Sequence, residues 1–203
     1  PKSGEFRYIC SEIICPMNID RIINNVYRLP SASKDILLNH ISENTYPCGF
    51  LLFRENIRGA KAYFIKKGIV RAFAYHNDKE VTFWFGKEGD IVFPLQTLYS
   101  DSGEYENVEL LEECSLYEIG IDKLQELFQN DIHLANWGRK YMEYACIRSE
   151  KQFIARQFKT STERYRELIG EYPDITQRIP LGIIASYLGI SQVSLSRIRA
   201  RRK

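Results

Sequence analysis

The sequence predicts an α+β protein, with an antiparallel β-sandwich or barrel followed by a long helix and a compact group of helices. Residues 46–121 hold seven short segments rich in aromatic and β-branched side chains, which fit a half-buried pleated surface. Gly, Asn and Asp residues between the segments supply turns, and no helical pattern intervenes, which favours antiparallel pairing. After residue 121 the apolar residues recur at helical spacing instead.

The expected strands cover residues 51–53, 62–65, 69–75, 81–85, 91–93, 108–111 and 115–119. A short helix at 33–41 is expected to precede them, because its apolar residues fall at helical spacing. Further helices are expected at 122–130, capped by Asp122, and at 163–171, capped within 160–162.

The segment 131–158 predicts one helix roughly 40 Å long, because it lacks Pro and contains a single Gly, Gly138. A helix of this length needs a large surface to pack against, and a second copy of the chain is the economical one. The barrel of its own chain is the alternative. The expected seam follows alternating three- and four-residue steps: Leu134, Trp137, Tyr141, Tyr144 and Ala145, continued by Arg148, Gln152 and Ala155.

Composition restricts the class of protein. The 203 residues are 44% hydrophobic and 27% charged, as in a folded soluble protein with one large domain or two small ones. No stretch approaches the roughly 18 apolar residues of a membrane helix. The five cysteines form no CxxC pair and are expected to be reduced. We therefore expect a cytoplasmic protein without a membrane partner.

Charge is distributed unevenly along the chain. Residues 151–203 carry 11 Lys and Arg against 4 Asp and Glu, whereas residues 1–150 carry 17 against 22. Residues 88–122 contain ten carboxylates and no Lys or Arg. A basic end on an acidic body indicates a polyanionic partner for that end.

The C-terminal residues match the constraints of a helix-turn-helix. Helices are expected at 181–188 and at 192–201, the second capped by Ser191. Ala185 is small where the two helices cross, and Gly189 accepts the left-handed conformation of the tight turn. The buried faces consist of Ile184, Leu188, Ile190, Leu195 and Ile198.

The outer face of the second helix predicts double-stranded DNA as the partner. Gln and Arg make bidentate hydrogen bonds to adenine and guanine edges, so Gln192 and Arg197 are expected to read sequence. Ser191 can offer its hydroxyl and the helix N-terminus to a phosphate. The full expected DNA-binding set is Ser191, Gln192, Val193, Ser194, Ser196, Arg197, Arg199 and Arg201. A helical hairpin with a solvated basic tail is the structural alternative.

This order of elements resembles the Crp/Fnr superfamily of bacterial transcription regulators. The likeness rests in the barrel on Tyr46-x-x-Gly49-x-x-Leu52-Phe53, Tyr63-Phe64-Ile65-x-x-Gly68-x-Val70-Arg71 and Gly89-Asp90. The C-terminal stretch, with Ile184-Ala185-Ser186-Tyr187-Leu188-Gly189-Ile190-Ser191, looks like a subgroup common in Bacteroidetes.

The resemblance implies a division into three parts. These are a jelly-roll β-roll like a cyclic-nucleotide-binding domain at 17–130, a dimerisation helix at 131–159 and a helix-turn-helix domain at 160–203. It further implies a homodimer on a palindromic operator, with RNA polymerase as another candidate partner, and it places Arg197 at the guanine-reading position of the recognition helix.

The ligand site departs from the nucleotide-binding members of this superfamily. Those carry Gly-Glu for the ribose and Arg-Ser or Arg-Thr for the cyclic phosphate, where this chain has Phe93-Pro94 and Glu104-Tyr105. A carboxylate repels a phosphate, so we expect no control by cyclic nucleotide and no cofactor. The barrel aromatics are expected to form either a core or a pocket for an unknown apolar or cationic effector. The candidate pocket residues are Phe83, Phe85, Phe93, Tyr99 and Tyr105.

Other functions have weaker support in the sequence. An iron–sulfur sensor needs clustered N-terminal cysteines, and only Cys10 and Cys15 lie near each other. A haem sensor would need an axial ligand such as His76, which also fits an exposed turn. A cupin-type enzyme needs two or three converging histidines, and only His76 falls among the expected strands, so we expect no enzyme activity and no metal site. The remaining alternative is a β-roll interaction or ligand-binding module with weak or no specific DNA binding.

Overall fold

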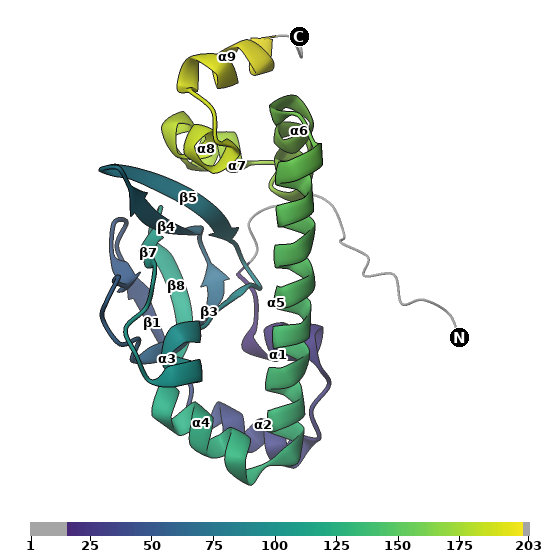
Figure 1. Ribbon diagram of the computed structural model, residues 1–203. Coiled ribbons are helices and arrows are strands. Elements are labelled where there is room, and N and C mark those ends of the chain that lie inside the picture. The colour runs from purple at the N-terminus through teal and green to yellow at the C-terminus, as the bar shows by residue number, and fades with distance from the viewer. Residues whose placement is uncertain (1–15, 201–203) are drawn as a thin grey trace.

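Two four-stranded antiparallel sheets form a β-roll, and helices continue from it to the C-terminus (Figure 1). The computed structural model describes residues 16–200. One sheet has the strand order β1-β8-β3-β6 and the other has the order β2-β7-β4-β5. The strands are β1 (Ser42–Tyr46), β2 (Leu51–Phe53), β3 (Lys61–Lys67), β4 (Val70–His76), β5 (Lys79–Gly86), β6 (Ile91–Val92), β7 (Asn107–Leu110) and β8 (Cys114–Gly120).

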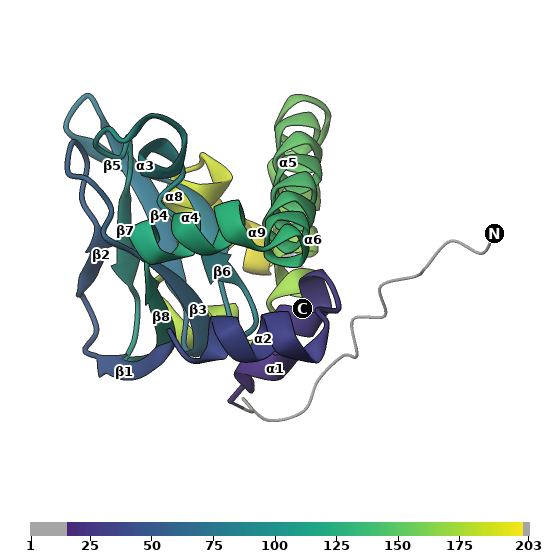
Figure 2. The ribbon, with the colours of Figure 1, turned by 90° about the horizontal axis from the view of Figure 1, so that it is seen from below.

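The long helix α5 runs along the side of the β-roll, as Figures 1 and 2 both show. Helices α1, α2 and α4 lie near its N-terminal end, and the C-terminal helices gather at its other end (Figure 1). The helices are α1 (Ile19–Val26), α2 (Ser31–Leu38), α3 (Leu95–Ser100), α4 (Ile121–Asn130), α5 (Ile132–Phe158), α6 (Ser161–Glu171), α7 (Ile175–Arg178), α8 (Leu181–Leu188) and α9 (Gln192–Ala200). This is the α+β architecture expected from the sequence.

The β4–β5 hairpin is closed by a tight turn at Asn77 and Asp78. Both residues have positive φ angles, 50° and 60°, as the two central residues of the favoured hairpin turns do. His76 pairs with Lys79 at the end of the ladder and is exposed. His76 therefore lies in an exposed turn, which was the simpler of its two interpretations.

Helix α5 packs onto its own β-roll through the first part of the expected dimer seam. Leu134 and Trp137 are fully buried in a core shared with α1, α2 and α4. The Trp137 Nε1 donates a hydrogen bond to the Ile23 carbonyl at 3.0 Å. Gly138 allows the close approach of Phe128, because an added Cβ would lie 2.8 Å from the tip of that ring and would force it to shift. The prediction that these residues face a second copy is wrong, because the aromatic face of α5 fits the apolar surface of its own domain.

Four short elements were not predicted, and their compositions explain why. Strand β1 has four exposed residues out of five, so it shows no apolar alternation. Helix α3 begins after Pro94, and α1 and α7 span only eight and four residues. Helix α2 occupies Ser31–Leu38 rather than 33–41.

Helix α4 begins at Ile121 after Gly120, so the prediction that Asp122 caps this helix is wrong. Asp122 lies in the first turn and forms an ion pair with Arg58 instead. An acidic side chain in this position is favoured by the helix dipole without serving as the cap.

Within residues 16–200 no single helix combines the length and apolar character needed to cross a membrane. The bent pair α8 and α9 meets those two criteria only when both helices are taken together.

Candidate functional site

Helices α8 and α9 are joined by a tight turn and lie at 97° to each other. This angle is within the roughly 90–120° of helix-turn-helix motifs. Gly189 occupies the left-handed region with φ 65°, and the Ile190 N–H closes the turn by donating to the Ala185 carbonyl at 3.0 Å. Ala185 and Leu195 are buried, 3% and 0% exposed, so the two helices share a small apolar core.

The candidate base-reading residues lie on the outer face of α9. Gln192 and Arg197 are exposed, and Arg197 has no hydrogen bond or ion pair with residues 16–200. The Ser191 hydroxyl accepts the Ser194 N–H at 3.1 Å, as expected of the helix cap. Of the remaining candidates, Ser191, Val193, Ser196 and Arg199 are exposed, Ser194 is half-buried, and Arg201 lies outside the described residues, as do Cys10 and Cys15.

Helix α6 contacts the C-terminal end of α8, next to the turn that leads into α9. Thr160 and Glu163 form a capping box at its start, which confirms the expected N-cap. Arg164 donates to the Leu188 carbonyl at 2.8 Å, at the C-terminal end of α8. This bond satisfies one of the last carbonyls of α8 and joins α6 to the turn.

Strand β5 is the part of the β-roll that contacts α8 and the C-terminal end of α6. The Ser186 hydroxyl of α8 accepts the Thr82 N–H at 3.0 Å and donates to the Glu80 carbonyl at 2.9 Å. Phe85 packs between Tyr172 and Tyr187, with ring centroids 6.2 and 4.9 Å away. Phe85 therefore belongs to the contact between the β-roll and the C-terminal helices, where it also lines a groove formed with α5 and α6. Its role as a ligand-pocket residue stays a prediction.

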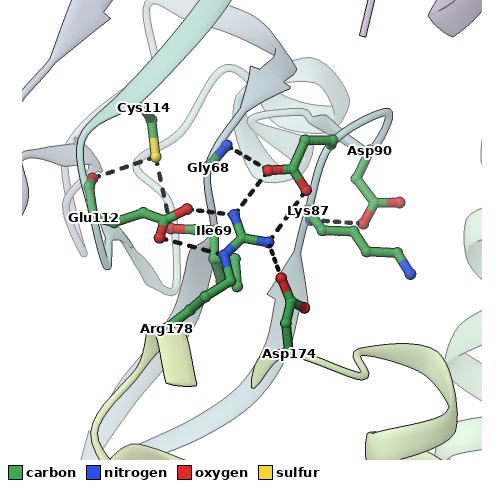
Figure 3. Close-up of polar contacts among 9 residues, drawn as sticks. Gly68, Ile69, Lys87, Asp90, Glu112, Cys114, Asp174 and Arg178 are labelled. Atoms are coloured by element: carbon green, nitrogen blue, oxygen red, sulfur yellow. Dashed lines mark hydrogen bonds and ion pairs between the residues drawn. The ribbon is translucent and has the colours of Figure 1, made fainter. Parts of the chain in front are cut away.

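A cluster of ion pairs around Arg178 forms a second contact between α7 and the β-roll (Figure 3). The guanidinium binds Glu88 at 2.8 Å, Asp174 at 3.2 Å, and Glu112. Its side chain is only 9% exposed. Burial acts to lower the pKa of Arg178, but the hydrogen bonds that its guanidinium donates to Glu112 and Glu88 outweigh burial, and the pKa is raised. We name this set of four residues the Arg178 cluster.

Arg148 of α5 connects the β-roll with α6. It binds Asp90 at 3.3 Å, Glu171 at 2.9 Å and the Tyr172 hydroxyl at 2.8 Å. Burial raises the pKa of Asp90, and Arg148 opposes that rise. The sequence predicts Arg148 in the seam between copies, but its guanidinium binds residues of its own chain.

A cavity of about 210 Å³ lies between the β-roll and α5. Phe83, Phe93 and Tyr105 line it, as expected of pocket residues. Tyr99 is 90% exposed and lies on the surface, so its assignment to the pocket is wrong. Asp90 of the Gly89-Asp90 motif also lines the cavity, together with residues that the sequence analysis did not single out, among them Trp84, Glu106 and Ser149. From the expected seam, Tyr141, Tyr144, Ala145, Arg148 and Gln152 also line the cavity.

Glu104 and Glu106 have different environments although both are buried. Glu104 accepts the N–H groups of Gln96 and Thr97 at 3.3 and 2.9 Å, so it caps the first turn of α3. Glu106 lines the cavity. Burial, reinforced by the charge of Glu104, raises the pKa of Glu106 to about 7. The sequence comparison places Glu104 at the expected ligand site, whereas in the structure it is Glu106 that lines the cavity.

Among residues 16–200, no three His, Cys, Asp or Glu side chains lie close enough together to hold a metal ion. Cys114 is buried, and burial raises the pKa of its thiol to about 12.

Residues 43–131 match the family described as cyclic nucleotide-binding domain. Similar solved structures include FixK2 from Bradyrhizobium japonicum, with 18% identity, coverage of 79% of this chain and 83% of that chain, and a TM-score of 0.70. A protein described as a transcriptional regulator of the crp/fnr family from Eubacterium rectale has 15% identity, coverage of 84% and 82%, and a TM-score of 0.69. The c-di-GMP responsive global regulator CLP of Xanthomonas campestris has 17% identity, coverage of 85% and 91%, and a TM-score of 0.62.

These comparisons show a cyclic nucleotide-binding domain match over residues 43–131 and a fold shared with solved Crp/Fnr-type structures, in which a β-roll is followed by C-terminal helices, in agreement with the resemblance seen in the sequence. At such low identities the solved structures establish the fold alone. The Bacteroidetes subgroup stays a prediction. No curated protein matches the chain in sequence.

Proposed function

We propose that the protein is a sequence-specific DNA-binding transcription regulator that acts as a homodimer on a palindromic operator and has no catalytic role. The observation that carries the proposal is the exposed face of α9, where Gln192 and Arg197 are available to base edges. Arg199 adds a cation suited to phosphate contact. The regulatory proteins that share the fold support the same role.

The first test is selection of binding sites from a random duplex pool at one fixed salt concentration, because phosphate contacts make affinity strongly salt-dependent. We expect a two-fold symmetric site. Arg197→Ala is expected to relax one base position in each half-site and to cost about 1–3 kcal/mol of binding free energy. Affinity is measured by fluorescence anisotropy on the selected duplex.

Arg54→Ala is the matched control, because Arg54 is also exposed but lies after β2 on the β-roll. It is expected to leave both the consensus and the affinity unchanged. Weak binding without a consensus, or a consensus that Arg197→Ala leaves intact, would contradict the proposal and favour a β-roll interaction module.

The dimer is proposed to form through a different face of α5 from the predicted seam. Ile147, Ile154 and Phe158 are 51%, 52% and 84% exposed. Their spacing of seven and four residues places them on one stripe of the helix, about 60–100° around its axis from Trp137 at 3.6 residues per turn. Ile147 and Ile154 also line a groove between α5, α6 and β5. A stripe of large apolar side chains on a long helix is the kind of surface that a second copy covers.

Ile154→Glu is expected to convert the dimer to a monomer, because it places a charge in the centre of that apolar stripe. Light scattering coupled to size-exclusion chromatography measures the mass. Ile57→Glu is the control, since Ile57 is 55% exposed and lies on the β-roll. A dimer that survives Ile154→Glu at micromolar concentration would rule out this face.

Control by cyclic nucleotide is not part of the proposed function. The cavity presents the Glu106 carboxyl group, and the neighbouring Glu104 adds negative charge. A cyclic phosphate in this place would meet electrostatic repulsion.

A further inference from the structure

Glu106 is a buried carboxyl group without a partner at the cavity between the β-roll and α5. The residue is 8% exposed and lines the cavity. No side chain or backbone group of residues 16–200 forms a hydrogen bond or ion pair with its carboxyl oxygens. A buried charge without a partner costs free energy, so natural proteins rarely retain one without a use for it.

The other charged side chains that line the cavity, Asp90 and Arg148, have ion-pair partners. Arg148 is paired with Asp90 and with Glu171. Asp90 also accepts the Lys87 N–H at 3.0 Å. Among the charged side chains that line the cavity within residues 16–200, Glu106 is therefore the one left without a partner.

The rest of the wall is mainly aromatic. Six rings line the cavity, from Phe83, Trp84, Phe93, Tyr105, Tyr141 and Tyr144. Aromatic faces attract cations, and cages of aromatic rings bind organic ammonium groups. The volume of about 210 Å³ far exceeds the roughly 10–15 Å³ that one water molecule needs. A cation with an apolar body fits both the charge and the surface of this space.

We propose that the cavity binds a small organic cation, an amine, with Glu106 as its counter-ion and the aromatic side chains around its apolar body. The inference rests on the proposed regulator and names the chemical class of its effector. Two cavity residues also contact the C-terminal helices, since Arg148 binds Tyr172 and the Gln152 amide donates to the Tyr187 hydroxyl at 3.0 Å. A bound amine thus lies beside the contacts that position α6 and α8.

The test is calorimetric titration of the full chain, without DNA, with two probes of similar shape and opposite charge. These are 2-phenylethylamine and 3-phenylpropanoate, used at about pH 8 so that the amine is charged and Glu106 is ionised. We expect saturable binding of the amine and none of the carboxylate. Cyclic AMP in the same titration is expected not to bind.

Glu106→Gln is expected to weaken amine binding by about tenfold or more, because it removes the charge while keeping the shape. Glu113→Gln is the matched control, since Glu113 is exposed in the same acidic segment, and it is expected to have no effect. Thermal unfolding shows whether the Glu106→Gln protein is folded. We expect it to be at least as stable as the parent, because an unpaired buried charge is removed.

Equal affinity for the two probes, no saturable amine binding at millimolar concentration, or undiminished binding by Glu106→Gln would each overturn the proposal. Because DNA is absent, these outcomes leave the operator-selection result unaffected. Loss of DNA binding with intact amine binding would instead contradict the proposed regulator alone.

Discussion

Replacing Trp137 with Ala is expected to lower the free energy of unfolding by about 3–5 kcal/mol, the range for deleting a large buried aromatic side chain. Trp137 is fully buried. Its ring centroid lies 6.0 Å from that of Phe64, and it stacks on Tyr141 at 6.4 Å. The substitution also removes the hydrogen bond that joins α5 to the Ile23 carbonyl of α1. The void left by the deleted indole ring would lie where the β-roll, α1 and α5 meet.

Urea unfolding at one protomer concentration measures this effect, because the stability of the proposed dimer would depend on concentration. Tyr99→Ala is the control, since Tyr99 is 90% exposed, and it is expected to change stability by no more than about 0.5 kcal/mol. A loss below about 1 kcal/mol for Trp137→Ala, together with a change from dimer to monomer, would return Trp137 to the seam between copies.

Replacing Arg178 with Ala is expected to lower the free energy of unfolding by about 3 kcal/mol, the lower end of the range for removing one partner of a buried ion pair. The substitution leaves Glu88, Glu112 and Asp174 facing one another without a cation. Glu88 is 13% exposed and so has little access to water, whereas Asp174 is 40% exposed, which places the expected cost at the lower end. The repulsion acts between the β-roll and α7, so the C-terminal helices should loosen first.

Hydrogen exchange of backbone amides measures this order of opening, with faster exchange expected in α6 to α9 than in the β-roll. Arg58→Ala is the matched control, because Arg58 also binds two carboxylates, Asp101 and Asp122, but all three side chains are well exposed. Arg58→Ala is expected to change hydrogen exchange and the free energy of unfolding only slightly, because exposed ion pairs contribute little to stability. Adding Glu88→Gln to Arg178→Ala is expected to restore part of the lost stability, because it removes one of the repelling carboxylates. Identical behaviour of the Arg178 and Arg58 variants would show that the Arg178 cluster does not hold the helices to the β-roll.

The α8–α9 unit could be predicted closely because its constraints are local. Gly189 supplies a left-handed turn, Ala185 permits the close crossing, and Ser191 caps the second helix, all within a few residues of one another. Helix α8 spans the predicted residues 181–188 for this reason. The β5 strand was also recognisable, since its aromatic and β-branched residues lie between two turns.

The cavity between the β-roll and α5 could be predicted only in part, because its wall comes from segments that are far apart in the chain. Alternation along a strand does not say which neighbour covers each face, so Phe85 and Phe93 looked equivalent. Phe85 packs against the C-terminal helices, whereas Phe93 lines the cavity. Likewise Glu104 and Glu106 differ by two positions, and only the placement of α3 makes Glu104 a helix cap.

The sequence alone determined the order of the parts, the turns between strands, the length of α5 and the polar face of α9, because each depends on side chains close together in the chain. The tertiary structure alone decided which face of α5 is buried, which carboxyl group is left without a partner, and how the Arg178 cluster joins α7 to the β-roll. The physical reason is that desolvation and ion pairing depend on distances between segments that only the completed fold sets.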